Sequence, residues 1–227
     1  MSTAESPKTA QPQSASREIA ATAASVGAQH TGASASPPDA LAPSSWIIRF
    51  APLVPAGARV LDVACGRGRH ARLFAARGCR VLAVDRDAAA LAELAGTAGI
   101  ETRAIDLEAG GNPLSGERFD AIVVVNYLHR PLFPHLIAAL AADGVLLYET
   151  FARGNEAYGR PANPDFLLAR DELLQRVRDG LTVLAFEQGH VRRAGRDAVV
   201  ERLAAIGPAR AWPPSLPPLA GGAEPRA

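Results

Sequence analysis

Residues 60–70 read VLDVACGRGRH, an apolar run that passes through a Gly-Arg-Gly turn into residues suited to a helix. The run Arg59–Ala64 predicts a strand, and Arg69–Arg77, with its apolar residues on one face, predicts a helix. Glycines at positions 66 and 68 let the backbone turn sharply and approach a ligand closely. A strand, a glycine turn and a helix in this order are typical of the ligand-binding edge of an open α/β sheet.

Outside this stretch, the chain continues to alternate short aliphatic runs with helical segments. Strands are predicted at Arg80–Asp85, Ile100–Ile105, Phe119–Val125 and Gly144–Phe151, and helices at Asp87–Leu94 and Pro131–Ala141. Such continuous Val, Ile and Leu runs are typical of strands buried on both faces, as in parallel sheets. Two later runs, 181–191 and 196–206, resemble an antiparallel pair that completes the sheet. The prediction is an α/β fold with a doubly wound Rossmann-like sheet, mostly parallel, with an antiparallel C-terminal strand pair.

The composition indicates one globular domain between two low-complexity ends. Of the 227 residues, 48% are hydrophobic and 21% are charged, so the whole chain is neither disordered nor fibrous. Ala, Ser, Thr, Pro and Gln dominate residues 1–44, which we expect to be a disordered tail. Residues 45–207 are expected to form the domain. The Pro- and Gly-rich residues 208–227 predict a second tail, whose Trp212 is expected to cap the core.

Charge and cysteine content exclude several classes of function. The net charge of +1 implies no broad electrostatic field for nucleic acid or an anionic membrane. Apolar stretches fall short of the roughly 18 residues that a membrane helix needs, and residues 1–44 lack the apolar core of a secretory signal. Cys65 and Cys79 are expected at opposite ends of the sheet, unpaired, as in a reducing cytoplasm. No Cys/His cluster has zinc-binding spacing, so we expect no metal.

The glycine turn fits two classes of cofactor. Gly66, Gly68 and Ala71 satisfy the G-x-G-x-x-A pattern of dinucleotide-binding folds, and an acid, Asp85, ends the second strand. Asp62, however, stands four residues before Gly66, where its carboxylate would repel a pyrophosphate. The ammonium and sulfonium groups of S-adenosylmethionine (SAM) would be attracted there. The sequence therefore favours SAM, and a NAD-type oxidoreductase is the alternative from another class.

Taken in order, the motifs resemble those of the class I SAM-dependent methyltransferases. The resemblance is carried by LDVACGRG (61–68), VLAVDRD (81–87), AIDLEAG (104–110), ERFDAIVVVNYLHR (117–130) and LAADGVLLYETF (140–151). Within that superfamily the chain is most similar to small single-domain enzymes of the tellurite-resistance or thiopurine methyltransferase type. The resemblance implies that residues 45–207 form a methyltransferase domain with SAM as its cofactor.

The resemblance also implies which residues bind the cofactor. Asp62 is expected at the methionine end of SAM, and Asp85 is expected to accept hydrogen bonds from both ribose hydroxyls. Asp106 would accept from the adenine amino group, while Leu107 donates its backbone N–H to the ring. Asn126 would hold the methionine moiety. The remaining cofactor-binding positions are Ala64, Gly66, Gly68 and Arg86.

The methyl acceptor is expected beyond the carboxyl ends of the strands. His129 and Tyr127, which follow the strand Phe119–Val125, are the candidate catalytic residues; a base is needed only if the acceptor arrives protonated. The polar segment Ala152–Phe166 is typical of a lid. Its candidate substrate contacts are Arg153, Asn155 and Tyr158.

We therefore expect a cytoplasmic enzyme that moves the sulfonium methyl of SAM to a small-molecule acceptor by in-line displacement. An RNA or protein methyltransferase of the same fold is an alternative. Arg69 and the arginines of 190–196 could bind an RNA or an anionic substrate. Arg69 is otherwise expected on a solvated helix face. The run Asn126–His129 lacks the Pro-Pro pair of DNA amino-methylating enzymes. A non-catalytic SAM-binding subunit is a further alternative. No nucleic-acid or membrane partner is expected, and no feature specifies an oligomeric state.

Overall fold

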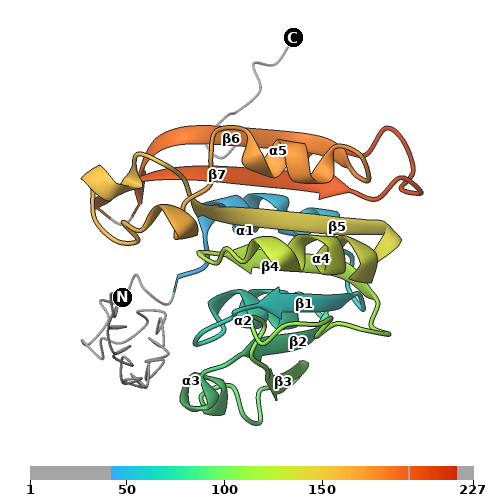
Figure 1. Cartoon of the computed structure of the whole chain (residues 1–227). Coiled ribbons are helices and arrows are strands. Elements are labelled where there is room, and N and C mark those ends of the chain that lie inside the picture. Colours follow the sequence, from blue (N-terminus) through green and yellow to red (C-terminus); the bar gives the residue numbers. More distant parts are fainter. Residues whose placement is uncertain (1–41, 194, 219–227) are drawn as a thin grey trace, which may run out of the picture. The chain divides into compact units, whose positions relative to one another are not determined.

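The computed structural model describes residues 42–193 and 195–218, which contain a seven-stranded sheet in the order β3-β2-β1-β4-β5-β7-β6 (Figure 1). The strands are β1 (Arg59–Val63), β2 (Arg80–Asp85), β3 (Ile100–Ala104), β4 (Phe119–Val125), β5 (Leu140–Phe151), β6 (Thr182–Arg193) and β7 (Arg196–Ile206). Strands β1 to β5 pair in parallel, whereas β7 runs antiparallel to both β5 and β6. The predicted fold class is confirmed, including the C-terminal strand pair.

The sheet order reverses between β1 and β4. The chain adds β2 and then β3 on one side of β1 and then returns to place β4 on the other side. The connections that follow β1 and β4 lead to opposite sides of the sheet, which opens a crevice outside the carboxyl ends of these two strands. Ligands of such sheets bind in this crevice. The glycine turn that follows β1 therefore lies at the position where a cofactor is expected.

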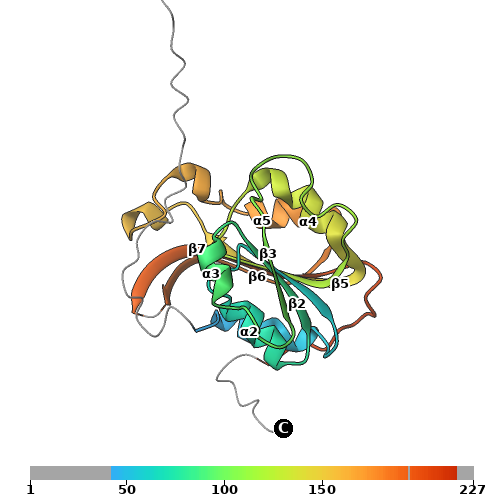
Figure 2. The same cartoon turned by 90° about the horizontal axis from the view of Figure 1, so that it is seen from below.

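Helices cover both faces of the sheet. They are α1 (Ser45–Phe50), α2 (Arg69–Ala76), α3 (Ala88–Ala92), α4 (Phe133–Ala139) and α5 (Glu172–Val177), with short 3₁₀ helices η2 (Ala51–Leu53), η3 (Arg130–Leu132), η4 (Asn155–Ala157) and η5 (Pro164–Phe166). The hydrophobic core on the face covered by α1, α2 and α3 contains Trp46, Phe74 and Leu94. The core on the opposite face contains Phe133 of α4 and Leu173 of α5. Figure 2 shows α2 on one side of the sheet and α4 and α5 on the other.

Side-chain caps begin two of the α-helices in the described part of the chain. The Asp87 carboxylate accepts hydrogen bonds from the N–H groups of Ala89 and Ala90, as its position before α3 predicts. Ser44 caps α1 by accepting from the Trp46 N–H. Ser44 is buried, so the folded part includes at least one residue of the predicted 1–44 tail. Residues 1–41 of that predicted tail lie outside the described residues.

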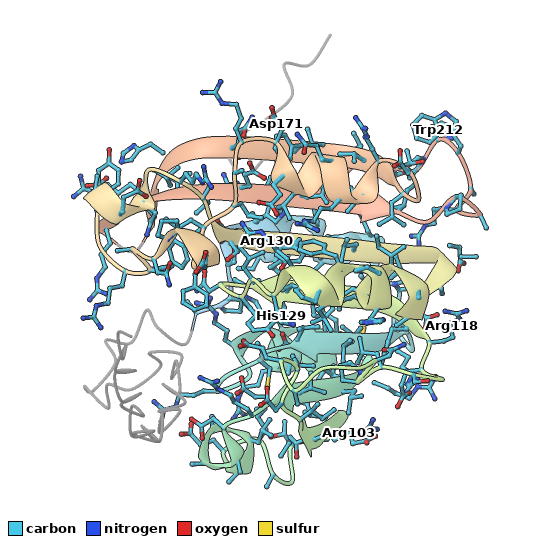
Figure 3. The ribbon with its side chains drawn as sticks, in the orientation of Figure 1. Arg103, Arg118, His129, Arg130, Asp171 and Trp212 are labelled. Atoms are coloured by element: carbon cyan, nitrogen blue, oxygen red, sulfur yellow. The ribbon has the colours of Figure 1, made fainter. Side chains whose placement is uncertain are left out.

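The C-terminal residues differ from the prediction in one respect. Trp212, expected to cap the core, is 72% exposed (Figure 3). The contact with the domain is made instead by Arg210, whose guanidinium donates to the carbonyl oxygens of Leu53 (2.6 Å) and Asp143 (3.1 Å). Residues 219–227 of the predicted tail lie outside the described residues. Within the described part of the chain, no helix has the length and apolar character needed to cross a membrane.

Replacing a buried aromatic in α2 should destabilise the domain strongly. Phe74 is fully buried between α2 and the sheet, so Phe74→Ala should lower the free energy of unfolding by about 3–5 kcal/mol in urea titrations. Ile48→Ala in α1 is the control, since half of the Ile48 side chain is exposed and the change should be under about 0.5 kcal/mol. Equal losses for the two variants would contradict the assigned core.

Candidate cofactor and acceptor site

The turn between β1 and α2 holds three residues with positive φ, Ala64 (51°), Gly66 (52°) and Gly68 (72°). A larger residue at Gly68 is disfavoured by the positive φ, and its Cβ atom would also require the buried Leu94 side chain to move. A Cβ atom on Gly66 would meet nothing within 4 Å, so the backbone at this position faces open space. A non-glycine residue with positive φ is strained, and such strain is typical of ligand-binding turns. The turn thus offers exposed backbone to a ligand, as predicted.

Asp62 lies beneath this turn with a side chain only 1% exposed. Its Oδ2 accepts a hydrogen bond of 2.9 Å from the Ala71 N–H, in the first turn of α2. Burial raises the pKa of Asp62 to about 7, and the nearby Asp85 carboxylate acts in the same direction, while the Ala71 hydrogen bond and Arg69 oppose it. A buried carboxyl group with this pKa gains from a cation brought beside it. The site therefore suits the ammonium group of SAM.

Asp85 joins the end of β2 to the glycine turn. Its Oδ2 accepts from the Gly66 N–H at 2.8 Å, and its Oδ1 accepts from the Asp87 N–H at 2.9 Å. Each carboxylate oxygen has a second lone pair, so both remain able to accept from hydroxyl groups. The half-buried carboxylate is thus held in a fixed orientation, which fits the ribose role predicted for it.

The residues expected at the adenine lie together beyond β3. The Ile105 N–H donates to the Asp85 carbonyl, which places Asp106 and Leu107 beside the end of β2. Asp106 is exposed, and its Oδ1 accepts from the Glu108 N–H at 2.9 Å, while Leu107 is buried. Asp106 thus presents an exposed carboxylate beside the end of β2, and the hydrogen bonds predicted from Asp106 and from the Leu107 N–H to adenine stay predictions.

Tyr127 lies near the side chains of Asp106, Glu108 and Arg86. Burial raises its pKa far above the ordinary value, and the carboxylates of Glu108 and Asp106 raise it further, with Arg86 opposing them. These neighbours belong to the segments after β2 and β3. A phenol that keeps its proton at neutral pH can donate a hydrogen bond but does not act as a base. The catalytic role of Tyr127 stays a prediction, and its high pKa limits that role to donating a hydrogen bond.

Asn126 follows β4 at the central crevice. Its backbone has φ 59°, and its N–H donates to the carbonyl of Glu149, on β5, at 2.9 Å. The exposed side chain is thus presented at the same edge as the glycine turn, as expected for a contact with the methionine moiety. His129 lies three residues further on, half-buried before η3 (Figure 3).

Arg130 braces the acceptor side and is not available to a substrate. It donates to both carboxylate oxygens of Glu172 at 2.8 and 2.9 Å, and to the carbonyl oxygens of Asp165 and Leu167. Although burial opposes ionisation, Arg130, Arg176 and the Ala169 N–H together hold the pKa of Glu172 down to about 2. Sequence analysis did not identify this ion pair, because its two residues are 42 positions apart.

The segment predicted as a lid is fastened to β7. Asn155 is buried, donates to the Pro161 carbonyl and accepts from the Val199 N–H, so it stabilises the loop rather than facing a substrate. Tyr158 is half exposed, and its ring centroid lies 5.0 Å from that of His190, on β6. Of the three predicted substrate contacts, Arg153 and Tyr158 remain exposed at this edge of the sheet.

Part of the chain matches a known protein family. Residues 60–143 match a family model described as a methyltransferase domain. No curated protein matches the sequence. Residues 60–143 therefore resemble a methyltransferase domain, which agrees with the predicted resemblance to SAM-dependent methyltransferases.

Solved structures of methyltransferases share the fold. TehB from Haemophilus influenzae is similar with a TM-score of 0.60 and 19% identity, over 71% of this chain and 61% of TehB. The N-methyltransferase NodS from Bradyrhizobium japonicum, in complex with S-adenosylhomocysteine (SAH), has a TM-score of 0.52 and 18% identity, over 71% and 83% of the two chains. A 1,6-didemethyltoxoflavin-N1-methyltransferase from Burkholderia thailandensis has a TM-score of 0.50 and 25% identity, over 71% and 76%. The chain thus spans less than two thirds of the length of TehB.

The raised pKa of Asp62 predicts a pH-dependent affinity for the cofactor. Below pH 7 the buried carboxyl holds a proton that must leave when an ammonium group binds beside it, so affinity should rise with pH. Between about pH 5.5 and 7 the rise should be about tenfold for the wild type and should be largely lost in Asp62→Asn. Calorimetric titration with SAM in two buffers of different ionisation enthalpy measures the released proton directly. A wild-type affinity that does not change with pH would refute this role.

Asp85 should contribute strongly to cofactor affinity, and its neighbour Asp87 should not. Asp85→Ala removes two acceptors and loosens the turn at Gly66, so SAM should bind about tenfold more weakly or worse. Asp87→Ala is the matched control, because it removes the cap of α3 and should cost about 1 kcal/mol of stability with little change in affinity. Calorimetry and thermal unfolding of both variants separate the two effects.

Proposed function

We propose that this chain transfers the sulfonium methyl group of SAM to a small-molecule acceptor. The observation that carries the proposal is Asp62, a buried acid held below a strained glycine turn at the crevice between β1 and β4. Such a group attracts a cationic ligand and would repel the pyrophosphate of a dinucleotide. The 1,6-didemethyltoxoflavin-N1-methyltransferase, which is similar in fold, acts by its name on a small molecule, and this supports a small acceptor.

Each part of the site has a distinct task in this proposal. Asp62 and Asn126 hold the methionine end of the cofactor, and Asp85 holds the ribose. Asp106 and the Leu107 N–H would hold the adenine ring, with Arg86 and Tyr127 nearby. The bound cofactor supplies an activated methyl group, and the protein fixes that group and the acceptor in line, which accounts for much of the catalysis in a displacement of this kind.

His129 is the group best placed to take a proton from an acceptor N–H or O–H. It stands beyond the carboxyl end of β4, between the cofactor-binding Asn126 and the brace formed by Arg130 (Figure 3). Its imidazole makes no hydrogen bond or ion pair to the described residues, so both ring nitrogens are available to a ligand. An acceptor that already carries a free lone pair would need only orientation from His129.

We also infer that the enzyme works in the cytoplasm without a nucleic-acid partner. Cys65 and Cys79 are both buried thiols and are not joined in a disulfide, as is usual in a reducing compartment. The formal charge of +1 gives no basis for strong non-specific attraction to nucleic acid. These features support the proposal and agree with a diffusible small acceptor.

An acceptor screen tests the proposed activity. The protein is incubated with SAM and a panel of small amines, phenols and nitrogen heterocycles, and SAH and methylated product are detected by mass spectrometry. With an acceptor that binds protonated, His129→Gln should lower kcat by about 10²–10⁴-fold while SAM affinity is unchanged. His135→Gln, on the neighbouring helix α4, should keep wild-type activity. Tight SAH binding without turnover on any small acceptor would contradict the proposal.

A further inference from the structure

Three polar residues from distant parts of the chain form a buried cluster, here called the Ser44 clamp. Ser44 Oγ donates to Glu149 Oε2 at 2.7 Å, and the Ser44 N–H donates to His70 Nε2 at 3.1 Å. Ser44 is 5% exposed, His70 3% and Glu149 0%. Buried polar groups are costly to separate from their partners, so the clamp holds the backbone at Ser44 firmly.

The clamp fastens a segment that crosses the carboxyl edge of the sheet. His70 lies in the first turn of α2, which follows β1, whereas Glu149 lies near the end of β5, and β4 stands between β1 and β5. Figure 1 shows the chain that enters α1 passing the edge where these strands end. A second contact reaches the same segment, since Arg69 Nη1 lies 3.4 Å from the Ala42 carbonyl. Arg69, expected on a solvated helix face, is instead half-buried against this segment.

Both ends of the clamp adjoin residues of the methionine end of the cofactor site. His70 precedes Ala71, whose N–H holds the Asp62 carboxylate, and follows the glycine turn by two positions. On the other side, the carbonyl of Glu149 accepts from the Asn126 N–H at 2.9 Å. A shift of segment 42–44 would therefore be transmitted to Asp62 through α2 and to Asn126 through β5.

The geometry does not support nucleophilic catalysis by Ser44, although serine, histidine and glutamate are present together. The Ser44 hydroxyl is directed at a carboxylate, and the ring nitrogen of His70 accepts from a backbone N–H rather than facing the hydroxyl. Because Nε2 is an acceptor, the proton of the neutral ring lies on Nδ1. The hydrogen bonds of the cluster therefore fix the position of the backbone at Ser44.

We propose that Ser44, His70 and Glu149 are positioning residues that fix segment 42–44 as a wall of the methionine end of the SAM site. Binding of the cofactor is then coupled to the packing of α1 on the sheet. The coupling is reciprocal, so a ligand that contacts segment 42–44 in its clamped position also stabilises α1. The proposal rests on the proposed cofactor site. Helix α1 is suited to this coupling because Trp46, at its start, also donates from Nε1 to the Leu203 carbonyl on β7.

Cofactor affinity in clamp variants of the full chain tests the proposal. Glu149→Gln and Ser44→Ala should each weaken SAH binding by about tenfold, whereas Ser44→Thr, which keeps the hydroxyl, should stay within about twofold of the wild type. Glu201→Gln is the matched control, because Glu201 is equally buried on β7 and accepts from the Leu173 N–H. It should lower the melting temperature without weakening SAH binding.

Hydrogen exchange supplies a readout that a purely structural role would not change. SAH should slow amide exchange in residues 44–50 of the wild type and of Glu201→Gln, and this protection should be lost in Glu149→Gln. A Glu149→Gln protein that melts earlier yet binds SAH like the wild type, with protection of 44–50 intact, would overturn the proposal. Failure of the wild type itself to bind SAH would instead overturn the proposed function, and with it the coupling.

Discussion

The hydrogen bond from the Ala71 N–H to the buried Asp62 carboxylate ties the end of β1 to the first turn of α2. The loop between these two points must close within a few residues, which requires positive φ at Gly66 and Gly68. The N–H groups of a first helical turn have no partner within the helix, so a carboxylate satisfies one of them and is stabilised by the helix dipole. Burial opposes that charge, and the balance leaves a carboxyl group that ionises near neutral pH. The proposed cofactor crevice therefore depends on this balance between burial of the Asp62 carboxylate and its hydrogen bond to the Ala71 N–H.

The fold could be predicted from the sequence because its signals are local. Aliphatic runs such as Phe119–Val125 became central strands, and Asp87 capped α3 as its position suggested. The glycine turn and the acids at the ends of β1 and β2 belong to short motifs, in which a few neighbouring residues determine the backbone. Helices α1 and α5 were not predicted, because six residues each carry too little periodicity to be recognised.

Side-chain direction at the strand ends could not be predicted in the same way. Tyr127 was expected at the acceptor but lies near Asp106 and Glu108, because the order of β1, β2 and β3 beside β4 decides which side it meets. Asn155, expected to contact a substrate, is held by β7 through Val199, 44 positions away. Such contacts depend on topology, and a single sequence carries no local signal for them.

The two halves of the site therefore differ in how they are built. The cofactor half depends on motifs whose residues lie within about one turn or strand end of each other, so a substitution there acts directly on the ligand. The acceptor half depends on contacts between distant segments, such as Arg130 with Glu172. A brace of this kind can hold loops of different length and composition, since the ends of the loops are fixed while their middles are free to vary. The same cofactor site can thus be combined with different acceptor-side loops, and the Ser44 clamp adds one distant contact, between Ser44 and Glu149, to the cofactor half.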